Sequence, residues 1–450
     1  MSRTLLAHAA LVATFDDTAR EIAGASLLLE DGIIGDIVEP GAPEPRADER
    51  IDCSNLVLIP GLVNTHHHFY QTLTRNLPAA QDAGLFDWLR VLYPIWARIT
   101  PEALTVATKT AIAELLLSGC TTTSDHMYLW PNGCRLDDQI AAAQELGIRF
   151  HALRGSMSLG ISSGGLPPDD LVEREPGILA DCQRVIDAYH DSRRYAMTRI
   201  AIAPCSPFSV TPQLMKDSIA LARDRGVHAH THLAETLDEE RYCIDTFGCR
   251  PVELAERLGW LGADVWHAHA VHVSDDDCKR LGATRTGAAH CATSNMRLGS
   301  GIAPVRKLLA AGVRVGLGVD GSASNDGSNM LDEARHAMLL QRVRHGAREL
   351  SAREALGLAT RGGAATLGRD DIGMLAPGMA ADIAGWRIDA SEFAGGAASD
   401  PLAALVFCRA PNAALVIVNG RVRVCEGALV DFDLPQHVRR HNDISRALLA

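Results

Sequence analysis

Residues 58–68 read LIPGLVNTHHH, a short apolar run that ends in three consecutive histidines. A run of this length, interrupted by Pro60 and Gly61, favours a buried β-strand over a helix. On an extended chain His66 and His68 point to the same side, so both can bind one metal ion. The stretch therefore predicts a strand whose end presents a pair of metal ligands.

Further short apolar runs that end in polar residues follow this strand along the chain. They cover residues 121–127, 149–156, 198–204, 227–235, 264–272, 287–293 and 313–320. Helical stretches lie between them, for example 101–117 and 211–225, and the second opens with Thr211 as N-cap and Pro212 at the first helical position. Eight strands that alternate with helices predict an α/β fold, a (β/α)₈ TIM-type barrel.

The two ends of the chain have a different residue pattern from the middle. Short segments with alternating apolar and β-branched residues, bounded by turn residues, occur at 23–32, 33–38, 50–59, 381–386, 415–420 and 422–430. Asn419 and Gly420 form a hairpin-turn signal between two of them. We expect residues 1–59 and 370–450 to build one small β-sandwich domain, and residues 60–369 to form the barrel.

Composition narrows the function classes. The chain has 450 residues, of which 47% are hydrophobic, and a formal net charge of −12, so nucleic acid and anionic membranes are not expected partners. The sequence contains no run of 18 apolar residues, so no membrane span is expected, and the N-terminus carries no convincing signal peptide. Eleven Cys without a CxxC pair predict a reducing compartment, the cytoplasm.

Ionisable residues recur at the ends of the predicted strands, where the catalytic groups of a barrel gather. Five of the eight strand ends carry them: His66 and His68, then His230 and His232 with Glu235, then His269, His290 and Asp320. One histidine in an apolar strand is more often a hydrogen-bonded core residue than a ligand. Five strand ends of this kind on one face are hard to explain by packing, because buried ionisable groups cost free energy unless they are paired or bind a metal. The pattern predicts a metal site.

Several of these stretches resemble the motifs of the amidohydrolase superfamily. The similar segments, in chain order, are residues 60–68 (PGLVNTHHH), 232–235 (HLAE), 269–272 (HAVH), 293–295 (TSN), 316–320 (GLGVD) and 375–383 (LAPGMAADI). The chain is most similar to the deaminase branch that includes guanine and S-adenosylhomocysteine deaminases and triazine hydrolases. Within that branch, residues 68–75 (HFYQTLTR) and 322–326 (SASND) are most similar to deaminases of 8-oxoguanine.

The resemblance implies a site residue by residue. One divalent metal, zinc with iron as the alternative, is implied to be held by His66, His68, His232 and Asp320. Binuclear relatives use a carbamylated Lys on the fourth strand, and residues 201–205 (AIAPC) contain none, so a mononuclear site is implied. Such a metal lowers the pKa of a bound water towards neutrality.

The resemblance also implies the proton-transfer groups. Glu235 is the expected proton shuttle, His269 is expected to contact the activated water, and Asp320 to accept its proton. His67 and His230 are interpreted as structural, whereas the roles of His126 and His290 stay open.

Aromatic and amide groups near the strand ends predict a pocket for a heteroaromatic base. The expected substrate-binding residues are Gln71, Trp88, Arg154, Cys205 and Asn325. The implied reaction is hydrolytic deamination of a purine-like base, with 8-oxoguanine and water giving urate and ammonia as the first hypothesis. The alternatives are guanine, isocytosine or S-adenosylhomocysteine-type deamination, a triazine amino- or chlorohydrolase, and a non-catalytic binding scaffold. The retained ligands, with Glu235 and His269, argue against the scaffold, and a homo-oligomer is left open.

Overall fold

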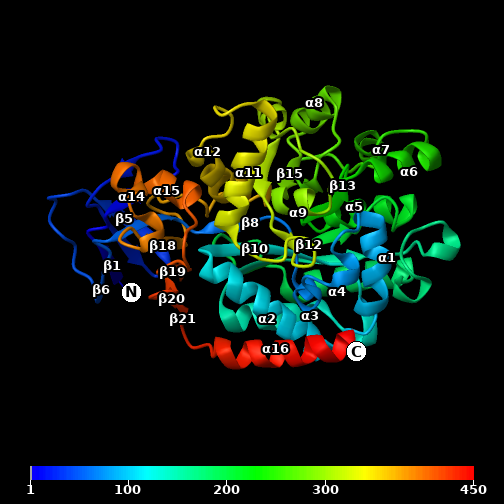
Figure 1. Cartoon of the computed structure of the whole chain (residues 1–450), viewed down its shortest axis with the longest axis horizontal. Helices are drawn as coiled ribbons and strands as arrows, with labels where there is room; N and C mark the ends of the chain where they lie inside the picture. Colours follow the sequence, from blue (N-terminus) through cyan, green and yellow to red (C-terminus); the bar gives the residue numbers. More distant parts are fainter. Residues whose placement is uncertain (1–2) are drawn as a thin grey trace.

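A closed barrel of eight parallel strands forms the centre of the protein, which is described here for residues 3–450 from a computed structural model (Figure 1). Around the barrel the strands are β10 (Cys120–Met127), β11 (Arg149–Ser156), β12 (Thr198–Pro204), β13 (His228–Leu233), β14 (Val265–His269), β15 (Gly287–His290), β16 (Arg314–Leu317) and β8 (Leu62–Asn64). Leu317 of β16 pairs with Asn64 of β8 and closes the ring. The predicted (β/α)₈ barrel is confirmed.

Helices connect the strands and surround the barrel. Thr100 caps α2, and Thr211 caps α5 by accepting a hydrogen bond from the Leu214 N–H, so both predicted helices are present. The α-helices between residues 69 and 382 are α1 (Leu85–Trp96), α2 (Pro101–Leu117), α3 (Leu136–Leu146), α4 (Glu175–Tyr189), α5 (Pro212–Asp224), α6 (Leu237–Phe247), α7 (Pro251–Arg257), α8 (Asp275–Ala283), α9 (Ala292–Arg297), α10 (Val305–Ala310), α11 (Met330–His345), α12 (Ala352–Gly357) and α13 (Gly363–Thr366).

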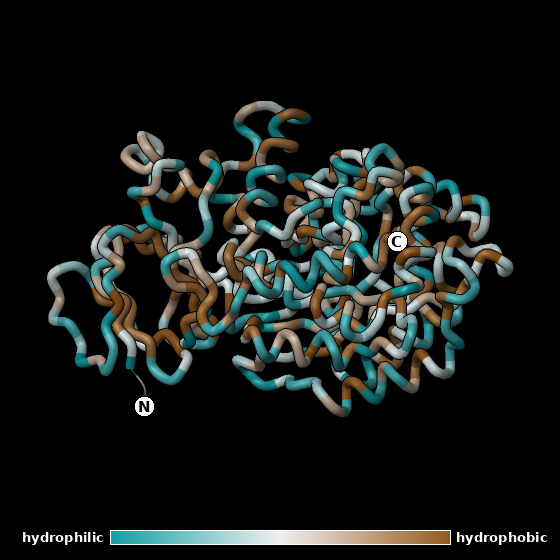
Figure 2. The backbone as a smooth tube through the Cα atoms, turned by 60° about the horizontal axis from the view of Figure 1, so that its bottom comes forward, coloured by the Kyte–Doolittle hydropathy of each residue, from teal (hydrophilic) through white to brown (hydrophobic). Residues whose placement is uncertain are grey.

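Strands from both ends of the chain form two further sheets beside the barrel. The first has the order β5 (Ile33–Val38), β4 (Ser26–Glu30), β1 (Arg3–Ala7), β6 (Glu49–Asp52), and the second β21 (Ala428–Leu429), β20 (Arg421–Cys425), β19 (Leu415–Val418), β18 (Ile383–Arg387), β7 (Leu56–Pro60), β2 (Leu11–Ala13), β3 (Glu21–Ile22). Leu27 of the first sheet and Leu58 and Ile417 of the second belong to one buried apolar cluster. Figure 2 shows hydrophobic segments inside this lobe and hydrophilic loops at its rim. The terminal strands thus form a sheet domain, and the boundaries at residues 59 and 370 stay a prediction.

The last helix leaves this domain and returns to the barrel. After α14 (Gly396–Ser399) and α15 (Pro401–Phe407), α16 (Leu434–Leu449) runs alongside α2 (Figure 1). His441 Nε2 lies 3.1 Å from Thr72 Oγ1, and the Ser445 hydroxyl donates to the carbonyl of Leu73 at 2.7 Å. The C-terminal segment therefore also supports the turn η1 (Phe69–Thr74) that follows the first strand.

Side chains fill the barrel interior and position its polar end. Val63, Leu153, Ala201 and Trp266 pack together inside the barrel wall. Above them, the two-residue strands β9 (His67–His68) and β17 (Asp320–Gly321) pair at the carboxyl end of the barrel. Within residues 3–450, no helix is long and apolar enough to cross a membrane.

Candidate metal centre and substrate pocket

Four buried side chains from three separated segments meet at the carboxyl end of the barrel. His68 Nε2 lies 3.1 Å from His232 Nε2. Asp320 Oδ1 lies 3.3 Å from His66 Nε2 and 3.3 Å from His68 Nε2. The four residues expected to hold a metal are therefore brought together.

The backbone fixes which nitrogen of two histidines is available. His68 Nδ1 lies 2.7 Å from the carbonyl oxygen of His126, and His232 Nδ1 lies 2.7 Å from that of Cys205. Because a carbonyl can only accept, both Nδ1 atoms carry a hydrogen, and in the neutral rings both Nε2 atoms present a lone pair. Without an added proton or a cation, these lone pairs would face each other at 3.1 Å.

His66 is oriented by a relay through His230. His230 Nδ1 donates to the Trp266 carbonyl at 2.9 Å, so its Nε2 accepts from His66 Nδ1 at 2.9 Å. The remaining nitrogen, His66 Nε2, is buried and makes no hydrogen bond within residues 3–450, although Asp320 Oδ1 lies 3.3 Å away. Burial lowers the pKa of His66 well below its usual value, which favours the neutral imidazole that binds metals.

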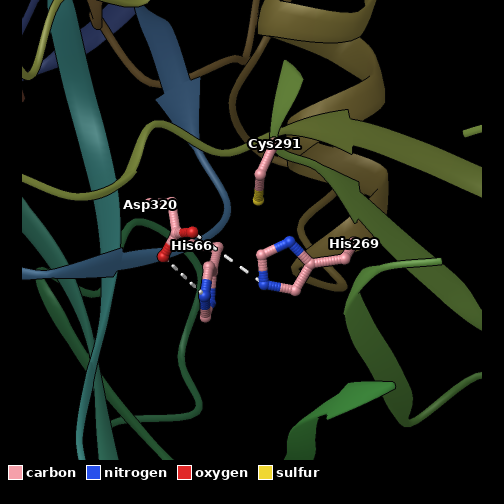
Figure 3. A group of neighbouring side chains, drawn as sticks. All are labelled: His66, His269, Cys291 and Asp320. Carbon is pink, nitrogen blue, oxygen red and sulfur yellow. Dashed lines mark ion pairs between the residues drawn. The ribbon is translucent and has the colours of Figure 1, made fainter. Parts of the chain in front are cut away.

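This donor set fits a divalent metal. Three imidazole nitrogens with lone pairs, one of them orphaned, converge with one carboxylate, which is a chemistry typical of zinc. His66 and Asp320 also belong to a neighbouring group with His269 and Cys291 (Figure 3). Figure 3 shows Asp320 facing both His66 and His269, with the Cys291 side chain pointing towards the group.

Glu235 and His269 lie beside these four residues. Glu235 Oε2 is 3.5 Å from His269 Nε2, which is 3.9 Å from Asp320 Oδ2. His269 Nδ1 lies 3.0 Å from Asn295 Oδ1, an arrangement that places a hydrogen on Nδ1 and the lone pair on Nε2. Burial, together with the negative charge of Asp320, raises the pKa of Glu235 to about 8. These surroundings favour the protonated form of the Glu235 carboxyl.

A cavity opens above the cluster. Gln71, Trp88 and Cys205 line it, together with His68, His232, Glu235, His269 and Asp320. Its other lining residues are Leu85, Leu89, Tyr93, Tyr128, Ser206, Phe208, Leu298 and Ser324. None of these residues was predicted to contact substrate, although Tyr128 directly follows the end of β10, a position that could have indicated it.

Arg154 and Asn325, also expected to contact substrate, do not line this cavity. Leu153 points into the barrel, so the next residue of β11 points outward, and Arg154 bonds to Glu173 and Asp181. The amide nitrogen of Asn325 donates to the Val319 carbonyl at 2.6 Å. A position at a strand end therefore predicts substrate contact only where the alternation of side chains along the strand also points that residue into the barrel.

His126, His290 and His67 have distinct surroundings. The His126 ring stacks on His232 with ring centroids 4.9 Å apart, and its Nε2 donates to the Ala203 carbonyl at 2.7 Å. His67 Nε2 lies 3.0 Å from Ser328 Oγ, away from the cluster of ligands. His290 is buried and neither of its ring nitrogens has a hydrogen-bond partner among the described residues.

The barrel, the sheet domain and the His–Asp cluster define a class of metal-dependent hydrolase. The chain belongs to the amidohydrolase family, whose profile matches residues 57–423. It is 50% identical to the 8-oxoguanine deaminase of Pseudomonas aeruginosa over 453 residues, covering all of both chains. It is 36% identical to the hydroxydechloroatrazine ethylaminohydrolase of Pseudomonas sp. strain ADP, covering all of this chain and 96% of the relative. The structure of an atrazine chlorohydrolase from Arthrobacter aurescens complexed with zinc is similar, with a TM-score of 0.93, 35% identity, and coverage of 99% of this chain and 100% of the other.

Proposed function

We propose that this protein is a zinc-dependent aminohydrolase that converts 8-oxoguanine and water to urate and ammonia. The observation that carries the proposal is a buried carboxyl, Glu235, that lines the same cavity as metal-binding side chains and lies 3.5 Å from His269. The likeness to an 8-oxoguanine deaminase over the full length supports the choice of substrate.

The proposed ligands are His66, His68, His232 and Asp320. A divalent metal held there would lower the pKa of a water molecule and supply hydroxide at neutral pH. His230 and the carbonyls of His126 and Cys205 act on this chemistry indirectly, since they fix the ring orientation of the ligands.

The residues of the chain itself move the protons. Glu235 donates its proton to the ring nitrogen beside the carbon that water attacks, which makes that carbon more electrophilic. Asp320 accepts a proton from the attacking water, and His269, fixed by Asn295, orients it. The proton that Asp320 accepted then passes to the exocyclic amine, which leaves as ammonia.

The cavity wall suits a planar, polar base. Trp88, Tyr93, Tyr128 and Phe208 supply flat apolar surfaces, whereas Gln71 supplies an amide. The Ala323 N–H donates to Gln71 Oε1 at 3.4 Å, so the amide nitrogen of Gln71 is the group we assign to a carbonyl oxygen of the substrate. A triazine hydrolase is the second candidate, favoured by the fold of the atrazine chlorohydrolase.

Amine release from a panel of compounds tests the proposal, measured as ammonia from the bases and as ammonia or alkylamine from the triazine. The zinc-loaded protein is assayed with 8-oxoguanine, guanine, isocytosine, S-adenosylhomocysteine and a hydroxylated triazine. We expect the highest kcat/KM with 8-oxoguanine and urate as the product. A higher value with the triazine would establish the second candidate instead, and no turnover on any compound would favour a binding scaffold.

The setting of the enzyme is also part of the proposal. We assign it to the cytoplasm, where reducing conditions suit the eleven cysteines, all of which are free thiols. Its partner is a small-molecule substrate, with no role for nucleic acid or membrane. A homo-oligomer is compatible with this assignment.

A further inference from the structure

Glu239 is a buried carboxylate that lies next to the site but does not line the cavity. It sits in the first turn of α6 and is 0% exposed. Its Oε1 accepts the backbone N–H of Ala234 and its Oε2 accepts that of Glu235, both at 2.8 Å. One side chain therefore binds the backbone of the proposed proton donor and of the residue before it.

The sequence explains how Glu239 reaches this position. Thr236 is the N-cap of α6, and its hydroxyl accepts the N–H of Glu239 at 3.2 Å. In the usual capping box the acidic residue three positions later bonds the N–H of the cap itself. Here the carboxylate reaches one and two residues further back, to Glu235 and Ala234.

The turn that Glu239 holds has an unfavourable backbone conformation. Ala234 has φ of 55°, in the left-handed region that residues with a Cβ seldom adopt. The Ala234 carbonyl accepts the N–H groups of Val271 and His272 at 2.9 Å each. The peptide is thus fixed on its N–H side by Glu239 and on its carbonyl side by the segment that follows His269.

We propose that Glu239 is a positioning residue, which holds the turn at residues 234–235 so that the Glu235 carboxyl lies beside His269. The inference rests on the proposed function, because it assigns Glu239 a role only through the proton transfer by Glu235. Two charge-assisted hydrogen bonds in a buried place are strong, and their loss leaves two N–H groups unsatisfied. A small displacement of a catalytic group is costly, since proton transfer requires the donor within hydrogen-bond reach.

The first test replaces the carboxylate by its isosteric amide. In Glu239→Gln, the NH₂ group faces a backbone N–H, and one of the two hydrogen bonds is lost. We expect kcat to fall about tenfold or more with KM nearly unchanged and the zinc content unaltered. The matched control is Glu240→Gln on the same turn, because the Glu240 carboxylate accepts from Arg250 at 2.8 Å rather than from the backbone at residues 234–235, and we expect wild-type kcat from it. Wild-type kcat in Glu239→Gln would overturn the inference.

A double-mutant cycle separates positioning from a general structural role. If Glu239 acts through Glu235, then Glu235→Gln/Glu239→Gln keeps the residual kcat of Glu235→Gln alone. An additive loss in the double variant would contradict the inference. Glu239→Asp retains the charge at a shorter reach, so we expect a kcat between wild type and Glu239→Gln, and it supplies the comparison if Glu239→Gln does not fold.

Hydrogen exchange tests the hold on the turn independently of any substrate. We expect peptides that contain residues 234 and 235 to exchange faster in Glu239→Gln than in wild type or Glu240→Gln. If wild-type protein deaminates nothing on the panel, the proposed function fails while this exchange result still stands. Unchanged exchange in Glu239→Gln would overturn the inference whatever the activity.

Discussion

Both ends of the barrel bury charged side chains, but the hydrogen-bond partners of these side chains differ between the two ends. At the amino end of the strands, Arg149 donates to Asp382 through Nε at 2.9 Å and Nη2 at 3.0 Å, and its Nη1 donates to two carbonyls. Nearby, Arg369 forms the same two-pronged pair with Asp371. At the carboxyl end, by contrast, histidine lone pairs and a carboxylate face one another.

The difference shows which buried cluster is complete by itself. The Arg149–Asp382 pair joins the barrel to the terminal sheets and has opposite charges with matching donors and acceptors, so it requires nothing from solution. The cluster of His66, His68, His232 and Asp320 has an excess of acceptors, which a bound cation or an added proton would balance. The function is therefore assigned to the carboxyl end of the barrel, where the acceptor groups outnumber the donors.

The largest expected effect is at the carboxyl end. In Glu235→Gln, kcat is expected to fall by about 10²–10⁴-fold, because the amide cannot donate the proton that the ring nitrogen requires. Steady-state ammonia release measures this, and metal analysis of the same sample serves as the control, since Glu235 is not assigned as a ligand. Loss of the metal together with activity would show that the separation of ligand and proton donor is wrong.

The next effect is at the amino end and concerns stability. Asp382→Ala leaves Arg149 buried without its partner, which we expect to lower the free energy of unfolding by about 3–5 kcal/mol. Denaturant unfolding measures this, and the kcat of the folded fraction is expected to stay unchanged. The double variant Arg149→Met/Asp382→Leu is the control, because removal of both charges leaves neither unpaired. Equal destabilisation in the single and double variants would contradict the assignment.

A smaller, pH-dependent effect returns to the carboxyl end. Burial, with Asp320 nearby, raises the pKa of Glu235 to about 8, so the proton needed for catalysis is present below that pH and lost above it. We expect kcat/KM to fall about tenfold per unit on the alkaline side. Profiles of kcat/KM measured on both sides of pH 8 provide the test. A flat alkaline limb in the wild-type enzyme would argue against Glu235 as the acid.

The fold was largely predictable because its signals are local. The strands β11 and β12 coincide with the predicted ranges 149–156 and 198–204, since each is a short apolar run with clear polar ends. Helix α16 was not predicted, because residues 434–449 were included in a segment expected to form the β-sandwich. Their place is set by contacts with Thr72 and Leu73, more than 300 positions away along the chain.

The site residues were predictable where the residue type and its position at a strand end were enough to place the side chain. His68, His232 and Asp320 meet as expected, because parallel strands bring their ends to one mouth. The outward direction of Arg154 depends on the register of β11 in the barrel, which the sequence does not specify. The role of Glu239 depends on a left-handed turn at Ala234, a conformation for which alanine gives no signal.

Metal analysis of the purified protein tests the central claim most directly, since that claim is a cation requirement at the carboxyl end of the barrel. We predict about one zinc per chain in the wild type and a large loss in His232→Ala, whereas His67→Ala keeps the metal because His67 bonds Ser328 instead. Wild-type protein without bound metal after zinc loading, or equal metal in all three proteins, would contradict the account.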